Sequence, residues 1–190
     1  MPMLVRPALP AGSLCNRDQP VISDARLVLR PWDATDADAV RAVYSDPAIQ
    51  RWHTRTMVDA AEARAWIADR HARWDAERGA DWAVTEDEVL VGRVGLNGLD
   101  LHEAVAEPAY WVTPAARGRE VAVRALALLT AWTFDELDLH RLEVHHSVAN
   151  PASCRVAEKS GYPLEGTRRE SVRHADGWHD MHVHARLAEA

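Results

Sequence analysis

Residues 114–129, PAARGREVAVRALALL, place two arginines and a glycine directly before an apolar helical stretch. The first N–H groups of a helix have no partner within the helix, and the helix dipole adds partial positive charge there. Arg117 and Arg119 supply guanidinium groups suited to phosphate oxygens, and Gly118 lets the backbone approach a ligand closely. The strand, loop and helix over 109–137 therefore predict an anion site, with an ordinary solvated helix start as the alternative.

Glu120 stands in the middle of this loop, where a bound anion would meet a second negative charge. A carboxylate near the start of a helix also stabilises that helix, so the residue has a structural explanation too. Three interpretations stay open: a working anion site, an impaired one, or only a helix cap. In a working site, we expect the Glu120 side chain to face solvent or to pair with Arg117, Arg119 or Arg124.

Ten histidines raise the question of a metal site. His182 and His184 share one face of an expected strand, and others lie nearby in the sequence, namely His145, His146, His174 and His179. Such pairs are common on solvated sheet faces, and neither Cys15 nor Cys154 stands at zinc-ligand spacing. We therefore expect no metal and interpret the imidazoles as the lining of a binding groove. Cys154 is interpreted as a buried cysteine near a helix start, not as a nucleophile.

Hydrophobic periodicity and turn residues predict the elements that position these side chains. Strands are expected at 26–30, 81–85, 88–99, 109–112 and 141–148, followed by a hairpin that turns at 175–177. Helices are expected from Thr35 to about Ser45, from Asp59 to just before Gly79, from about Glu120 to Leu137, and from Asn150 to Gly161. Residues 46–56 are expected to form a loop. This order of elements predicts an α/β fold with a mixed sheet.

Composition narrows the class of protein. The 190 residues carry a formal net charge of −7, which argues against non-specific binding to nucleic acid or an anionic membrane. No apolar run reaches the ~18 residues of a membrane span, and the N-terminus lacks the apolar core of a signal peptide. Two cysteines form no disulfide framework and fit a reducing cytoplasm. Residues 1–24 are predicted to be a mobile N-terminal extension, and 25–190 one folded domain.

Residues 110–170, from YWVTPAARGREV to YPLEGTRRE, resemble the core of the GNAT acyltransferases. The closest resemblance is to the RimJ/RimL-like branch, the ribosomal-protein N-acetyltransferases. RLVLRPWDATDADAV and DPAIQRW resemble that branch's opening, and NPASCRVAEKSGYPLEG resembles its second signature. The resemblance implies a GNAT fold over 25–190, with a mixed, mostly antiparallel central sheet flanked by helices. It also implies a cytoplasmic enzyme that moves an acetyl group from acetyl-CoA to a primary amine.

The family's pyrophosphate loop has the pattern R/Q-x-x-G-x-G/A, which falls here on Arg117, Gly118, Arg119, Glu120, Val121 and Ala122. The first and last positions match, but Glu120 replaces the required glycine. A carboxylate about 4 Å from the pyrophosphate would weaken binding by about a thousandfold at a dielectric constant of about 20. A non-glycine residue in the left-handed backbone region also carries roughly 1–2 kcal/mol of strain.

Further roles follow from the resemblance. The backbone of Trp111, Val112 and Thr113 would pair with the pantetheine arm, and Asn150 would contact that arm. Ser153 would lie near the sulfur and protonate the leaving thiolate. Many other members use a tyrosine that would fall at Ala157 in this chain, so serine is the expected acid here, as is usual in this branch.

The chemistry implied is direct transfer in a ternary complex, in which proximity supplies much of the rate. An α-amino group, with a pKa near 8, needs less help to lose its proton than lysine does. Glu143 and Glu170 are candidates to accept that proton through water, or else ordinary surface carboxylates. Backbone N–H groups would stabilise the oxyanion.

The acceptor stays open between a protein N-terminus and a small-molecule amine, and the resemblance makes a homodimer reasonable. Two alternative functions remain. One is a non-catalytic GNAT-like binding module with an impaired CoA loop, which Glu120 favours. The other is an acyltransferase that uses a different acyl-CoA, such as succinyl-CoA.

Overall fold

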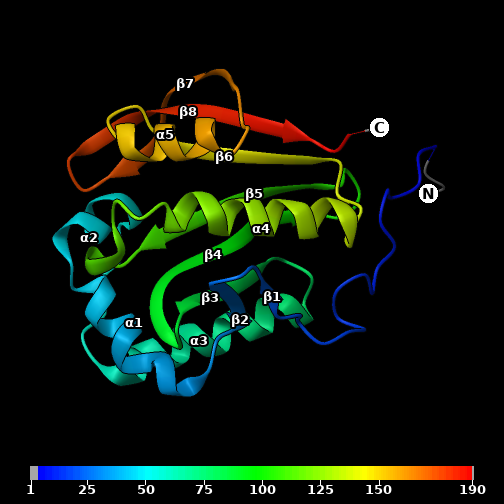
Figure 1. The fold of residues 1–190 in the computed structure, drawn as a ribbon. Coiled ribbons are helices and arrows are strands. Elements are labelled where there is room, and N and C mark those ends of the chain that lie inside the picture. The colour runs from blue at the N-terminus through cyan, green and yellow to red at the C-terminus, as the bar shows by residue number, and fades with distance from the viewer. Residues whose placement is uncertain (1–3, 190) are drawn as a thin grey trace.

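An eight-stranded sheet, ordered β1-β2-β3-β4-β5-β6-β8-β7, organises the computed structural model, which describes residues 4–189 (Figure 1). The strands are β1 (Ile22–Ser23), β2 (Leu27–Pro31), β3 (Ala80–Glu86), β4 (Val89–Asp100), β5 (Val105–Val112), β6 (Arg141–Ser147), β7 (Leu164–His174) and β8 (Gly177–Leu187). Neighbouring strands are antiparallel, except that β5 and β6 are parallel. The predicted α/β fold with a mixed, mostly antiparallel sheet is confirmed.

Helices cover both faces of this sheet. They are α1 (Ala37–Tyr44), α2 (Pro47–His53), α3 (Ala60–Asp75), α4 (Val121–Asp135) and α5 (Pro151–Lys159), with short 3-10 turns η1 (Ala34–Asp36) and η2 (Pro114–Ala116). Alternate residues of β3 point to opposite faces. Trp82 therefore packs in the core with residues of α4, whereas Ala83 packs with α1 and α3. Figure 1 shows α4 crossing in front of the central strands and α5 beside β6 and β8.

Tryptophans fill much of both core layers. Trp82 and Trp132 lie edge to face with ring centroids 5.1 Å apart in the layer under α4. Trp32 and Trp66 make the same kind of contact at 5.1 Å in the other layer. Trp178 is the clear exception, since 62% of its surface is exposed.

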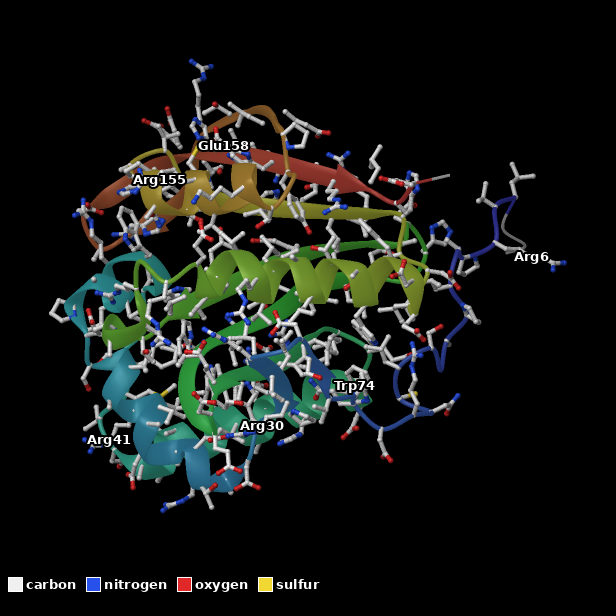
Figure 2. All side chains as sticks on the ribbon, in the orientation of Figure 1. Arg6, Arg30, Arg41, Trp74, Arg155 and Glu158 are labelled. Carbon is white, nitrogen blue, oxygen red and sulfur yellow. The ribbon has the colours of Figure 1, made fainter. Side chains whose placement is uncertain are left out.

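The N-terminal segment differs from the mobile extension expected over 1–24. Within the described part, Leu14 is fully buried and belongs to the main core. The Trp74 indole N–H donates to the Arg17 carbonyl at 3.1 Å, and Figure 2 shows Trp74 beside this segment. The segment from Leu14 onward is therefore packed against α3. The division into 1–24 and 25–190 stays a prediction.

Residues 46–56 were expected to form a loop, and this is wrong, because Pro47–His53 form α2. The Asp46 side chain accepts from the Ala48 N–H at 2.7 Å, and proline occupies the first helical position. A helix of two turns is too short to show a hydrophobic period, so only this N-cap could reveal it. The first helical turn of the chain is capped by Asp33 rather than by Thr35.

Candidate functional site

The cleft begins where the two parallel strands separate. β5 and β6 pair only through Val105 with Arg141 and Ala106 with Leu142, although both strands continue beyond these residues. A cavity of about 890 Å³ occupies the gap, lined by the later residues of both strands and by the starts of α4 and α5. Two helix N-termini and a free strand edge therefore face one cavity.

The free edge of β5 exposes backbone hydrogen-bonding groups to this cavity. The Thr113 N–H donates to the Val91 carbonyl of β4 at 2.9 Å. The polar groups of successive residues in a strand point to opposite edges, so those of Val112 and Tyr110 point away from β4 and toward β6. Trp111 and Val112 line the cavity, whereas Thr113 does not. Of the predicted stretch 111–113, Val112 is thus the residue whose backbone is free to pair.

The loop before α4 has the geometry that the anion prediction needs. Gly118 has φ = 76°, and Glu120 is the N-cap of α4 with φ = 58° and ψ = 16°, in the left-handed region. The glycine pattern is therefore a conformational requirement, which glutamate meets at the strain noted above. Most of the predicted loop residues line the cavity, namely Arg117, Gly118, Glu120, Val121 and Ala122, whereas Arg119 does not.

The Glu120 side chain has a partner that the sequence did not suggest. Its Oε1 lies 2.6 Å from Nζ of Lys159, at the end of α5, and 61% of its side chain is exposed. The hydrogen bond from Lys159 lowers the pKa of Glu120, so the carboxylate is charged at neutral pH. Of the two expected placements, the solvent-facing one is found and the arginine pairing is not. The three arginines have other carboxylates: Arg117 pairs with Asp46, Arg119 with Glu86, and Arg124 with Asp24.

Asn150 and Ser153 stand at the start of α5, and both line the cavity. Asn150 is the N-cap as predicted, and its Oδ1 accepts from the Ser153 N–H at 3.2 Å. The Ser153 hydroxyl lies 2.8 Å from the hydroxyl of Tyr110, which comes from β5. Burial raises the pKa of Tyr110 to about 12, so the phenol keeps its proton at neutral pH. The chain has alanine at position 157, where many family members have a tyrosine. Tyr110 of β5 instead places a phenol beside Ser153.

Neither predicted carboxylate lines the cavity. Glu170 is an exposed residue of β7, in the left-handed region at φ = 46°. Glu143, on β6, accepts from Arg141 at 2.7 Å and contacts Nε2 of His145 at 3.0 Å. Burial works to raise the pKa of Glu143, but these hydrogen bonds outweigh it and hold the pKa below its usual value.

Glu107 lines the cavity, and sequence reasoning missed it. It comes from β5, and its carboxylate lies 3.6 Å from Nδ1 of His145, which also lines the cavity. Burial raises the pKa of Glu107. The side chains of Glu107, His145 and Glu143 form a continuous chain from the cavity to β6. No sequence signal marks Glu107, because its partners are more than 30 residues away.

Helix α2 forms another part of the wall. Trp52 and His53 line the cavity, and the Trp52 ring lies 6.1 Å from that of His174. Burial lowers the pKa of His53 to about 4, with repulsion from Arg93 adding to the effect, so this imidazole is neutral at pH 7. The segment predicted as loop therefore places an indole and an uncharged imidazole in the site.

The start of α4 presents unpaired backbone N–H groups to the cavity, beside two parallel strands that separate. The Acetyltransferase (GNAT) domain family matches residues 26–163, and this chain belongs to that family of acyl-CoA-dependent N-acetyltransferases. An uncharacterised N-acetyltransferase of Bacillus subtilis, YoaA, is 25% identical over 169 residues, which are 87% of this chain and 96% of the relative.

One further curated protein and one solved structure are similar to this chain. The ribosomal-protein-serine acetyltransferase of Escherichia coli is 29% identical over 105 residues, which are 55% of this chain and 58% of that protein. The structure of Mycobacterium smegmatis RimJ in complex with CoA-disulfide has a TM-score of 0.82 at 22% identity, and covers 89% of this chain and 88% of its own. The resemblance to the GNAT family and its RimJ/RimL-like branch is confirmed. Within residues 4–189, none of the helices has the length and apolar character needed to cross a membrane.

Proposed function

We propose that this protein transfers an acetyl group from acetyl-CoA to the N-terminal amine of a peptide, by direct attack in a ternary complex. The observation that carries the proposal is the single cavity that joins three features. These are the start of α4, the free edge of β5, and the hydroxyl pair of Ser153 and Tyr110. A phosphorylated thioester needs all three, in that order along its length.

In this proposal the pyrophosphate binds the unpaired N–H groups at the start of α4. Lys159, beside Glu120, and Arg155 also line the cavity and carry positive charge. The arm of the cosubstrate follows β5, where Val112 offers its N–H and C=O as a neighbouring strand would. Asn150 caps α5 and orients the helix that carries Ser153.

The acyl transfer balances without a covalent enzyme intermediate. The amine nitrogen attacks the thioester carbonyl carbon, the C–N bond forms, and the C–S bond breaks to release the CoA thiolate. Ser153 donates its hydroxyl proton to that thiolate and regains one from Tyr110 across the 2.8 Å contact. Solvent water returns a proton to Tyr110, so that the proton lost by the amine and the proton gained by the thiolate balance through solvent. The proton lost by the amine passes through water to Glu107. His145 contacts the Glu107 carboxylate, and Glu143 contacts His145 in turn. Glu170 takes no part.

One observation supports a peptide N-terminus as the acceptor, and another supports an amine of either kind. One relative is named for acetylating serine in a ribosomal protein. In addition, Glu107 supplies a negative charge where a cationic amine would approach before losing its proton. A small-molecule amine is the second candidate acceptor, and the same site would serve it.

The test combines calorimetric titration with acetyl-CoA and mass spectrometry of peptides incubated with both. We expect micromolar binding and one added acetyl group on peptides with a free N-terminal serine. Peptides with a blocked N-terminus and a free lysine should stay unmodified. Ser153→Ala should lower turnover by about a hundredfold without changing acetyl-CoA affinity, whereas Ser160→Ala, outside the cavity, should leave both unchanged.

Other donors and acceptors give the outcomes that would redirect the proposal. Preferential turnover of succinyl-CoA would replace the acetyl donor, and preferential turnover of small amines would replace the peptide acceptor. If the chain bound none of the acyl-CoA donors, the catalytic proposal would be wrong and the binding-module alternative would stand.

A further inference from the structure

Four potential metal ligands meet beside the cleft. His146 lies on β6, His182 and His184 on β8, and Cys154 on α5. One ligand atom from each of them lies within 4.8 Å of the others. The arrangement follows from the fold, because His146 stands directly opposite His182 in the β6–β8 register, and α5 packs beside both strands.

The histidine nitrogens are arranged as they would be to hold a cation. Nδ1 of His184 lies 3.0 Å from the Tyr162 carbonyl, and Nδ1 of His146 lies 2.8 Å from the Ser147 carbonyl. A carbonyl only accepts, so each Nδ1 carries the proton and each Nε2 presents a lone pair. Backbone carbonyls commonly fix metal-binding histidines in this way.

Both lone pairs are buried, and among the described residues only that of His184 has a donor within reach, the weak thiol of Cys154. His146 is 5% exposed, and its Nε2 has no hydrogen-bond partner among the described residues. His184 is fully buried, and its Nε2 lies 3.8 Å from Cys154 Sγ. Nδ1 of His182 is also buried without a partner in this part of the chain. Buried polar atoms without partners are costly, so their concentration in one cluster favours a cation as their shared partner.

We propose that His146, Cys154, His182 and His184 bind one zinc ion. Tetrahedral zinc, with bonds of about 2.0 Å to nitrogen and about 2.3 Å to sulfur, sets the ligand atoms about 3.3–3.6 Å apart. The 3.8 Å between Cys154 and His184 is close to this, and the 4.8 Å limit for the whole set requires movements of about 1 Å. Imidazole and thiolate ligands favour zinc over magnesium or calcium.

Four protein ligands fill a tetrahedral shell, so the ion is structural and leaves no position for a substrate. It joins α5 to β6 and β8, and it therefore holds the helix start that carries Asn150 and Ser153. The sequence predicted no metal because the ligands lie on three separate elements. Only His182 and His184 are close along the chain, and Cys154 has no partner at zinc-finger spacing.

Cobalt(II) is the probe, since it replaces zinc and reports its ligands through absorption. The full chain, without a histidine tag and stripped of metal, should bind one cobalt per protein. It should show the visible bands of a tetrahedral ion and a near-ultraviolet thiolate charge-transfer band, and zinc should abolish both. Cys154→Ser should remove the thiolate band, whereas the matched variant Cys15→Ser should keep it. Binding should also release the thiol proton, so it should weaken as pH falls.

Thermal unfolding adds a readout that does not depend on colour. Zinc at about a hundred times its dissociation constant should shift the folding equilibrium about a hundredfold in the native chain and in Cys15→Ser. His182→Gln, at a half-buried position, should lose that shift and the tetrahedral bands. An absent charge-transfer band in the native protein, or a band that survives Cys154→Ser, would overturn the proposal.

Discussion

Replacing Glu120 by glycine tests how the loop before α4 tolerates a carboxylate. The side chain is mostly exposed, and its Oε1 lies 2.6 Å from Lys159 Nζ. The charge is therefore in a water-like environment and already has a counter-charge. The backbone is left-handed at φ = 58°, which glycine adopts without strain. The substitution changes two things together, the charge near the phosphates and the strain in the loop.

The magnitude follows from Coulomb's law at the dielectric constant of water. A unit charge about 8 Å away changes the binding constant by a factor of about 2.4, and two pyrophosphate charges make this about sixfold. Salt screens the effect further. We therefore expect Glu120→Gly to tighten CoA binding by about sixfold, not by the thousandfold of direct contact. Relief of strain and loss of the Lys159 contact oppose each other, so the thermal midpoint should change little.

Calorimetric titration with CoA, at one ionic strength, measures the native chain, Glu120→Gly and Glu120→Gln side by side. The glutamine variant loses the charge but keeps the left-handed strain, so it should show most of the gain in affinity. A gain of a hundredfold or more would mean that the carboxylate occupies the phosphate position. A gain with glycine and none with glutamine would mean that the backbone, not the charge, limits binding. Either result would refute this reasoning.

Three further predictions concern the cavity and the N-terminal segment. Tyr110→Phe should lower kcat by up to about tenfold and leave the CoA dissociation constant unchanged, and an equal loss of CoA affinity would contradict the proton relay. The pKa of His53 is about 4 in the folded chain and 6.5 for a histidine in an unstructured peptide, so the unfolded state takes up a proton first as the pH falls. Stability should thus drop between pH 6.5 and 4, by about 3 kcal/mol at most, and urea titrations of His53→Gln should lack this part of the slope. Leu14→Ala should destabilise the fold by about 2–5 kcal/mol in urea, because Leu14 is fully buried, and a loss below about 1 kcal/mol would indicate a loosely held segment.

Local signals in the sequence were sufficient for most of the fold. Asn150 and Pro151 mark the start of α5, and Asp176 with Gly177 marks the turn between β7 and β8, because caps and tight turns depend on neighbouring residues. Helix α2 was missed because two turns give too few positions for a hydrophobic period. The packing of residues around Leu14 depends on the distant indole of Trp74, which no local pattern reveals.

The site was predictable where it depends on backbone conformation and not where it depends on distant pairs. The glycine pattern of the pyrophosphate loop correctly marked Glu120 as a left-handed position. Its partner, Lys159, lies 39 residues away on another element. Tyr110 lies 43 residues from Ser153 and meets it only because β5 and β6 separate under α5. Such pairs require the topology and not only the order of elements.

Two of the cations that line the cavity, Arg117 and Lys159, are already matched by carboxylates, which explains how the loop accommodates Glu120. Arg117 pairs with Asp46, and Lys159 with Glu120. A phosphate that binds there must exchange with an existing partner, so these side chains give it less than the attraction of a free cation. The first-turn N–H groups of α4 have no such partner within the helix, and they carry their partial charge whatever the side chains do. Binding that depends mainly on these N–H groups is only weakly sensitive to one exposed, paired carboxylate beside them.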